Sequence, residues 1–109
     1  MAKEAKAFLN GQKVSLKDAK VGIMTHALHY GTAVFEGIRG NWNESKEKMI
    51  IFRLKEHYDR LLEGCKMLMI DIPYSSDELC KITIELLAKN NFKFSFYFRI
   101  FQRQSHFKE

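Results

Sequence analysis

The stretch Thr25–Gly40, with the sequence THALHYGTAVFEGIRG, decides how the rest of the chain is interpreted. It sets two histidines, aromatic residues and both signs of charge beside three glycines within sixteen residues. A buried strand is a plain run of Val, Ile and Leu, and a surface helix carries an apolar stripe every three or four residues. Glycine instead marks places where the backbone turns sharply or a ligand comes close. The stretch is therefore either the wall of a binding site or a Gly-rich connector packed in a core.

Length and composition indicate a single globular domain. The chain has 109 residues, close to the commonest domain size, and 46% of them are apolar and 28% charged. No apolar run approaches the roughly 20 residues that cross a bilayer, and the opening MAKEAKAF lacks the apolar core of a signal peptide. We therefore expect a cytoplasmic protein without a membrane partner.

The net charge of +5 raises the question of a nucleic-acid partner. The lysines are scattered among acidic residues, however, and no basic cluster is interleaved with aromatic residues. A solvated surface, or attraction for one anionic cofactor, accounts for the charge equally well. We expect no nucleic-acid partner.

Periodicity and turn signals predict four strands, two helices and a last strand. Phe8–Val14 has Asn-Gly at its centre, which is the strongest short-range signal for a hairpin. Val34–Arg39 and Met49–Arg53 are expected strands, joined by a polar turn at Asn41–Lys48. Phe92–Phe98 alternates phenylalanine with other side chains, which is the period of a strand.

The two helices are expected between the fourth strand and the last. The first begins at Leu54, shows apolar residues at helical spacing and ends at Ile72-Pro73. Ser75 and Glu78 announce the second as a capping box, and Asn90-Asn91 closes it. The expected fold is α+β: a small two-layer α/β sandwich with a mainly antiparallel sheet and two helices on one face.

Cysteine and histidine give no firm sign of a disulfide or a metal site. Cys65 and Cys80 fall on or near the apolar sides of the predicted helices, where packing is the simpler interpretation because free cysteine is commonly buried. His26 and His29 resemble half of a metal site, but no further ligand stands at a suitable spacing. We expect a hydrogen-bonded structural pair and no metal.

Four segments together resemble one enzyme family. ALHYGTAVFEGIR, at Ala27–Arg39, resembles the signature near the start of the branched-chain amino-acid aminotransferases, which are fold-type-IV pyridoxal-phosphate enzymes. Phe8–Gly31 resembles that family's N-terminal hairpin and the segment after it, Phe52–Leu68 its first helix, and Lys89–Ile100 the strand that ends in Tyr-x-Arg. The resemblance implies the small N-terminal domain of such an enzyme at residues 1–100, followed by a divergent basic tail at residues 101–109.

The resemblance assigns the contact with pyridoxal phosphate to Arg60. This residue matches the arginine that the family places on the cofactor phosphate, and the planar, charged fork of arginine can hold two phosphate oxygens. On the helical wheel Arg60 lies beside the buried stripe, so it can reach inward from the helix edge. Periodicity alone favours another interpretation, a surface arginine paired along the helix with Glu56 or Glu63.

The resemblance also implies a wall for the substrate. The residues that match family positions there are Tyr30, Phe35, Gly37, Arg39, Tyr97 and Arg99. Aromatic side chains suit Leu, Ile or Val, and a rim arginine suits the distal carboxylate of glutamate. Without the resemblance, core packing is the simpler interpretation of Phe35 and Tyr97. In the family the tyrosine at Tyr30 belongs to the partner subunit's site, which implies a homodimer.

The match stops short of a complete enzyme. None of the thirteen lysines lies in a segment that resembles the family's Schiff-base lysine, and Ile100 stands where the family has proline. One extra residue also precedes Tyr97 and Arg99, which leaves their register open. The expected function is that of an N-terminal fragment of a branched-chain aminotransferase, whose parent moves an amino group between Leu, Ile or Val and 2-oxoglutarate. Such a fragment supplies phosphate and substrate contacts but no catalysis alone. The alternative is a non-catalytic dimerisation or regulatory module that keeps only the fold.

Overall fold

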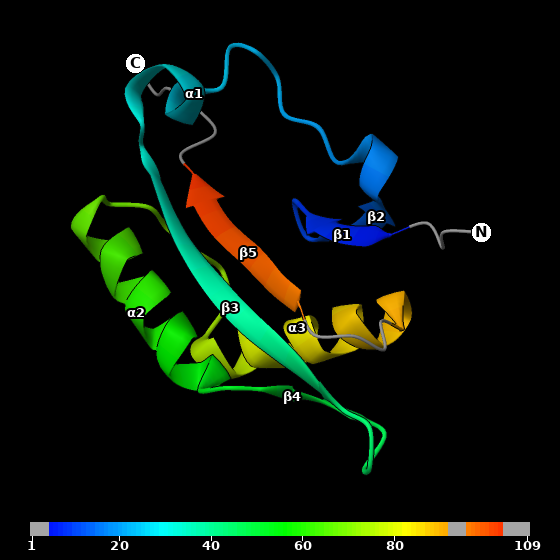
Figure 1. The fold of residues 1–109 in the computed structure, drawn as a ribbon. Coiled ribbons are helices and arrows are strands. Elements are labelled where there is room, and N and C mark those ends of the chain that lie inside the picture. Colours follow the sequence, from blue (N-terminus) through cyan, green and yellow to red (C-terminus); the bar gives the residue numbers. More distant parts are fainter. Residues whose placement is uncertain (1–4, 92–95, 104–109) are drawn as a thin grey trace.

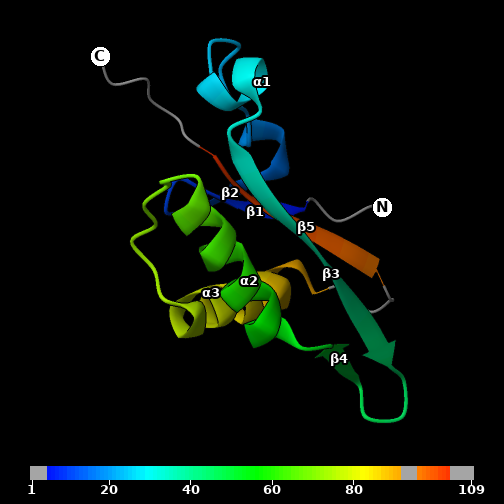
Figure 2. The same cartoon turned by 90° about the vertical axis from the view of Figure 1, so that its left-hand side faces the viewer.

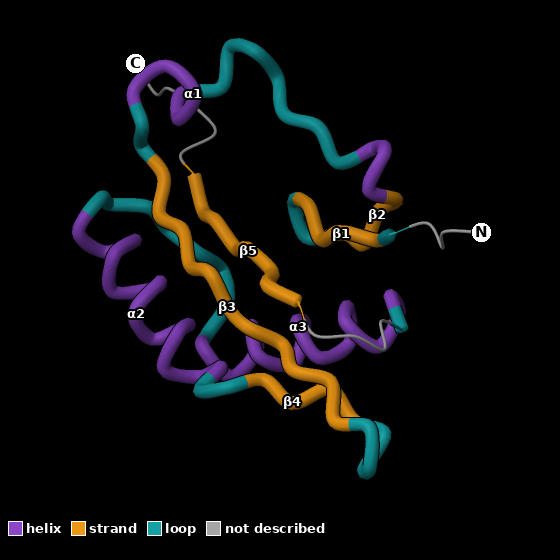
Figure 3. Tube along the Cα trace, viewed as in Figure 1, coloured by secondary structure: helices purple, strands orange, loops and turns teal. Residues whose placement is uncertain are grey.

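The computed structural model describes residues 5–91 and 96–103, the second range by its backbone. In chain order the elements are β1 (Lys6–Leu9), β2 (Gln12–Ser15), η1 (Leu16–Asp18), α1 (His26–Tyr30), β3 (Ala33–Asn43), β4 (Lys48–Ile51), α2 (Leu54–Met67), α3 (Ser76–Asn90) and β5 (Phe96–Arg103). The strands form one antiparallel pair, β1-β2, and one antiparallel three-stranded sheet in the order β4-β3-β5. Both long helices lie on one side of that sheet (Figure 1, Figure 2), and Figure 3 shows the helices, strands and loops in separate colours. The expected α+β fold is confirmed.

The first hairpin forms where the Asn-Gly signal places it. Asn10 and Gly11 both have positive φ, 51° and 83°, as the tight turn between antiparallel strands requires. Asn90 at the end of α3 then fixes this hairpin from a distant part of the chain. Its side-chain Oδ1 accepts a hydrogen bond from the Lys6 amide at 2.7 Å, and its Nδ2 donates to the Lys6 carbonyl at 3.2 Å.

The second hairpin is longer than expected. β3 continues through Asn43, and the turn occupies only residues 44–47, so the expected polar turn at Asn41–Lys48 is wrong at both ends. The reason is that strand pairing is made by the backbone: Asn41 pairs with Ile50 and Asn43 with Lys48, whatever the polarity of their side chains. The Asn43 side chain then accepts a hydrogen bond from the Lys46 amide at 3.0 Å and so shapes the turn.

The first long helix, α2, begins as expected but ends early. The sequence places its end at Ile72-Pro73, whereas the helix stops at Met67. Met69 takes a left-handed conformation, with φ 56°, and the Ile70 amide donates to the Cys65 carbonyl at 2.8 Å. This is a Schellman closure with methionine in the position that glycine usually occupies, so no sequence signal announced it.

The second long helix, α3, follows its predicted caps. The Ser75 hydroxyl accepts from the Glu78 amide at 3.2 Å, the Glu78 carboxylate accepts from the Ser75 amide at 3.2 Å, and Asn91 closes the helix in a left-handed conformation. Among the described helices, none combines the length and the apolarity that crossing a bilayer requires.

The core is small and lies between the two long helices and β3. Its buried members are Tyr58, Leu61, Cys65 and Leu79, with Val34, Leu54, Leu62 and Cys80 among the partly buried residues packed against them. The Thr83 hydroxyl donates to the Leu79 carbonyl at 2.8 Å and therefore accepts from the Tyr58 hydroxyl, which ties α2 to α3. Burial raises the pKa of Tyr58 to about 12, so this hydroxyl keeps its proton.

The last strand, β5, pairs with β3 along eight residues. The register joins Ala33 to Arg103 at one end and Gly40 to Phe96 at the other. The strand thus runs past residue 100, the end of the expected domain, into residues 101–103 of the expected divergent tail. Residues 92–95 of the expected strand at Phe92–Phe98, and residues 104–109 of the expected tail, lie outside the described residues.

Candidate functional site

The two faces of β3 differ sharply in exposure. Because successive strand residues point to opposite sides of a sheet, Phe35, Gly37 and Arg39 share one face, while Glu36 and Ile38 share the other. The first three are exposed, and Glu36 and Ile38 are buried on the side where α2 packs. Phe35 is 74% exposed, so the interpretation of this residue as ordinary core packing is wrong.

The exposed face has room for a ligand beside its backbone. Within the described part of the chain, a Cβ atom added to Gly37 would meet no heavy atom within 4 Å apart from those of its own chain neighbours. The Arg39 Nε donates to the Asn41 side chain at 2.9 Å, which directs this arginine along the strand. In the ladder, Tyr97 stands opposite Arg39 and Arg99 opposite Gly37, so these positions share the face. The side chains of Tyr97 and Arg99 lie outside the described residues.

Arg60 reaches β3 from the neighbouring helix. β4 pairs with β3 only from Gly40 to Asn43, so it does not cover the edge of β3 before Gly40. Figure 1 shows α2 beside that edge, on the side of β3 opposite β5. From α2, the Arg60 Nε donates to Glu36 Oε1 at 2.5 Å and its Nη2 donates to Glu36 Oε2 at 2.8 Å. Glu36 belongs to the buried face and the row of Phe35, Gly37 and Arg39 to the open face, so Arg60 contacts the strand through a residue that points away from that row.

A histidine shares the same carboxylate. His57, one helical turn before Arg60, lies with its Nδ1 2.8 Å from Glu36 Oε2. The Glu36 side chain is only 5% exposed, whereas that of Arg60 is 74% exposed. The hydrogen bonds from Arg60, and then those from His57, outweigh burial and lower the pKa of Glu36 below its ordinary value. Glu36 in turn raises the pKa of Arg60. The three side chains therefore form a charged cluster that we call the Glu36 cluster.

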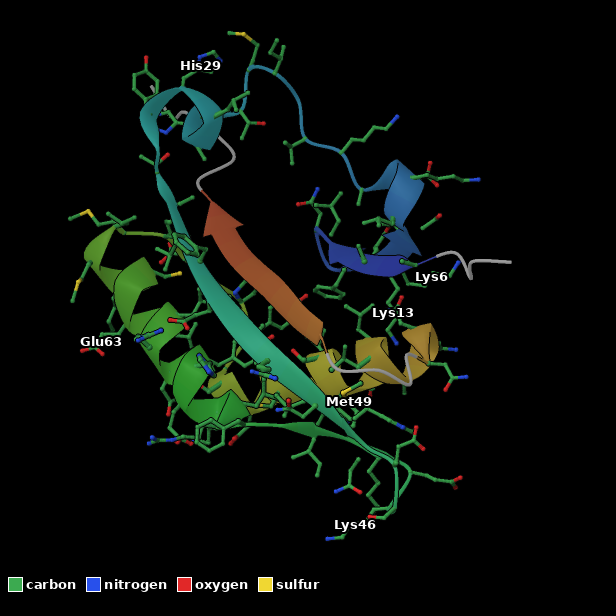
Figure 4. All side chains as sticks on the ribbon, viewed as in Figure 1. Lys6, Lys13, His29, Lys46, Met49 and Glu63 are labelled. Carbon is green, nitrogen blue, oxygen red and sulfur yellow. The ribbon has the colours of Figure 1, made fainter. Side chains whose placement is uncertain are left out.

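Pairing along the helix does not explain Arg60. Glu56 forms its ion pair with Arg53 at the start of α2, and Glu63 lies on the outer side of that helix, away from β3 (Figure 4). The alternative interpretation of Arg60, a surface pair with Glu56 or Glu63, is wrong, because its carboxylate partner comes from the strand.

The exposed end of the long loop carries Tyr30. One helical turn, α1, was not expected here; Gly31 closes it in a left-handed conformation, with φ 68°. Tyr30 is 72% exposed, and its ring lies 4.6 Å from the ring of His26, measured between centroids. His26 Nδ1 is 2.6 Å from the Thr32 hydroxyl. His29 Nε2 is 2.7 Å from the Ile23 carbonyl oxygen. Both histidines thus form hydrogen bonds within this segment, but to Thr32 and Ile23, whereas the sequence predicts a hydrogen-bonded pair.

A metal site is not found in the described part of the chain, where no three His, Cys, Asp or Glu side chains gather closely enough to hold an ion. An anion is a better fit. An arginine carries five N–H donors, and the bonds from Arg60 to Glu36 use two of them. The other three belong to an exposed guanidinium group, which suits a phosphate at the surface of α2.

Sequence reasoning missed Glu36 and His57 as site residues. One conditional signal for Glu36 was available: if Phe35, Gly37 and Arg39 line an exposed wall, the acid that alternates with them faces the buried side, where a charge needs a partner. His57 and Arg60 stand three apart on one helix, so both can reach such a partner. The pairing itself spans more than twenty residues of sequence and could not be read from local pattern.

The relatives and solved structures to which this chain is similar include several branched-chain aminotransferases. The chain is 46% identical over 93 residues to a probable branched-chain-amino-acid aminotransferase of Aquifex aeolicus, which covers 85% of this chain and 30% of that protein. The branched-chain aminotransferase of Thermoproteus uzoniensis, solved with norvaline, superposes with a TM-score of 0.88 at 38% identity, over 95% of this chain and 34% of that one. The branched-chain aminotransferase of Thermobaculum terrenum, solved in its PLP form, superposes with a TM-score of 0.81 at 30% identity, over 93% of this chain and 33% of that one.

These relatives extend well beyond the matched region, since the chain spans about a third of their length. The sequence model of the amino-transferase class IV family matches residues 33–106, which include β3, the Glu36 cluster and β5. On this match and these identities, the chain belongs to the amino-transferase class IV family.

Proposed function

We propose that this chain is the part of a branched-chain amino-acid aminotransferase that contacts the cofactor phosphate and the substrate. The complete protein would move an amino group between Leu, Ile or Val and 2-oxoglutarate. The observation that carries the proposal is the open face of β3, on which Phe35 and Arg39 are exposed on either side of Gly37. Several other large apolar side chains are also exposed, so the support comes from the combination of an aromatic ring, an open backbone and a positive charge on one face.

The cofactor would be pyridoxal 5′-phosphate, which serves as an electron sink when the amino group is transferred. Arg60 is the residue of this chain that would hold its phosphate, because its guanidinium is exposed and keeps donors that Glu36 does not use. The lysine that binds the cofactor covalently would come from the two thirds of the relatives' length that this chain does not span.

The open face would form the substrate wall. Phe35 offers an aromatic surface to the branched side chain, and burying such a side chain is favourable by roughly 1.5–3 kcal/mol. Gly37 leaves the backbone accessible, and Arg39 carries a positive charge for the distal carboxylate of glutamate. Tyr97 and Arg99 would join this wall from the neighbouring strand, as their ladder positions suggest.

A second copy would complete the assembly. Tyr30 is exposed on α1, away from Phe35 along the strand direction, and would enter the site of the partner subunit. The His26 ring against Tyr30 and the left-handed Gly31 fix the turn that presents the tyrosine.

A chimera tests the proposal directly. The matched residues of the Aquifex aeolicus relative would be replaced by those of this chain, and the purified product mixed with leucine, 2-oxoglutarate and pyridoxal phosphate. We expect glutamate to form, and we expect Arg60→Gln to weaken cofactor binding about 10- to 100-fold through loss of a charged hydrogen bond.

The matched control is Arg53→Gln, which removes an exposed arginine at the N-cap of the same helix that pairs with Glu56. This variant should bind the cofactor as the unaltered chimera does. A folded chimera without cofactor absorbance or turnover would favour the alternative, a module that keeps the fold and the partner surface only.

A further inference from the structure

Glu36 is a buried carboxylate to which the proposed function gives no role. Its residue is 4% exposed, yet it lies in the strand that carries Phe35, Gly37 and Arg39. A buried charge is costly unless it is paired and hydrogen-bonded. Replacing a buried ion pair by apolar residues of similar volume is often neutral or stabilising, so stability alone does not require a charge at this position.

The hydrogen bonds of Arg60 have a defined direction. The donors to Glu36 are Nε and Nη2, so the carboxylate meets the side edge of the guanidinium plane. The opposite part of the fork, formed by Nη1 and the second hydrogen of Nη2, is turned away from Glu36. Two parallel N–H groups on that outer edge have the spacing that two oxygens of a phosphate require.

His57 contacts the same carboxylate at Oε2, the oxygen that Arg60 Nη2 also contacts. Glu36 Oε2 lies 2.8 Å from both His57 Nδ1 and Arg60 Nη2. The side chain of His57 is 25% exposed, much less than that of Arg60. Two contacts from one helix therefore define the plane of the carboxylate, and the guanidinium that pairs with both oxygens must lie in that plane.

We infer that Glu36 is a positioning residue for an anion site: it holds the Arg60 guanidinium so that its outer edge, Nη1 and Nη2, faces a phosphate monoester. This inference rests on the proposed function, in which Arg60 meets the cofactor phosphate. The side chain of a free surface arginine samples many rotamers, and a fixed one loses less entropy when it binds. Glu36 thus raises the affinity for phosphate although its own charge repels anions.

The opposing effects give the test a clear sign. If Glu36 only neutralised Arg60, its removal would strengthen the binding of an anion, because a negative charge beside the site is lost. If Glu36 positions Arg60, its removal weakens that binding. The two probes are pyridoxamine 5′-phosphate and pyridoxamine, which differ by the phosphate and, as amines, do not form imines with the lysines.

The experiment is a titration of the full 109-residue chain, labelled with ¹⁵N, and followed by NMR at the arginine Nε–H signals. For the wild-type chain we expect the phosphate form to shift the Arg60 signal and to bind more tightly than pyridoxamine. We expect Glu36→Gln to reduce that preference roughly three- to tenfold. Glu56→Gln removes the same charge from α2 but pairs with Arg53, and it should leave the preference unchanged.

Two further measurements keep the result decisive if Glu36→Gln does not fold. Glu36→Asp keeps the charge but is shorter by one methylene, so positioning predicts a reduced preference and neutralisation predicts an unchanged one. In the wild-type chain itself, the ¹H–¹⁵N nuclear Overhauser effect at Arg60 Nε should approach the values of backbone amides. A freely moving Arg60 Nε, or a preference for phosphate that rises in either Glu36 variant, overturns the inference.

Failure of the proposed function gives a different pattern. If Arg60→Gln leaves the preference for pyridoxamine 5′-phosphate unchanged, Arg60 does not bind the phosphate and the proposed function loses its cofactor contact. If Arg60→Gln abolishes the preference while both Glu36 variants keep it, the phosphate contact stands and only the positioning role of Glu36 is wrong.

Discussion

The buried and the open faces of β3 use the same strand for different purposes. On the buried face, Ile38 is 0% exposed and Glu36 has partners for both carboxylate oxygens. On the open face, Phe35 is 74% exposed and nothing in the described chain lies within 4 Å of a side chain added at Gly37. Ile38 and Glu36 therefore contribute to the stability of the fold, whereas Phe35 and Gly37, one position away, are free to contact a ligand. Substitutions on the two faces should affect stability and binding separately.

The largest expected effect comes from the buried face. Ile38→Ala removes a fully buried side chain and should lower the free energy of unfolding by about 2–5 kcal/mol. Urea denaturation followed by circular dichroism measures the change. Phe35→Ala, at the neighbouring position, is the matched control and should change stability by less than about 0.5 kcal/mol. Equal losses in both variants would contradict the division between faces.

The next effect depends on charge and on pH. Glu36→Gln should cost about 1.5–3 kcal/mol at neutral pH, because it replaces charged hydrogen bonds to Arg60 and His57 on a buried group. The pKa of Glu36 is lowered from 4.5 in the folded chain, chiefly by Arg60. The unfolded chain therefore takes up this proton first, and the stabilisation is full above about pH 4.5 and disappears as the pH falls through the lower, folded value.

Unfolding curves between neutral pH and pH 3 show this dependence. The wild-type chain should lose more stability on acidification than Glu36→Gln, which has no such carboxyl group. Glu56→Gln is the control, since Arg53 also lowers the pKa of Glu56 but the Glu56 side chain is 54% exposed. Identical acid profiles for the wild-type chain and Glu36→Gln would contradict the Glu36 cluster.

A smaller effect tests the contact between α2 and the buried face. A Cβ atom at Gly64 would lie 2.9 Å from Val34 Cγ1, which is too close. Replacing a helical glycine by alanine usually stabilises by up to about 1 kcal/mol, whereas overpacking costs about 1–3 kcal/mol. Gly64→Ala should therefore lose about 0.5–2 kcal/mol in net terms. Adding Val34→Ala should recover part of that loss in a double-mutant cycle, and Gly37→Ala, on the open face, should lose nothing.

Local signals predicted the features whose causes are local. Asn10 and Gly11 form their turn, and the Ser75–Glu78 capping box forms at the start of α3, because each depends on residues within a few positions. The end of α2 was missed for a related reason. Met69 closes the helix in a conformation that glycine usually adopts, and only the packing of the chain after it selects that geometry.

The site was only partly readable for a different reason. The alternation of β3 shows that Phe35 and Glu36 face opposite ways, but not which of them is buried. Composition favours burial of phenylalanine, and the structure buries the acid, because Arg60 and His57 arrive from a helix more than twenty residues away. The close approach of Gly64 to Val34 is equally non-local.

The smallest effect is expected on the open face, where Arg39 lies. Arg39 is exposed, and the hydrogen bond from its Nε to Asn41 stays within one strand. Arg39→Ala should change the free energy of unfolding by less than about 0.5 kcal/mol, since surface substitutions away from buried contacts rarely do more. In the chimera with the Aquifex aeolicus relative, the same variant should raise the KM for glutamate more than the KM for leucine, because only glutamate has a distal carboxylate. Equal changes for both substrates would place Arg39 outside the wall, and a large loss of stability would mean that the open face also supports the fold.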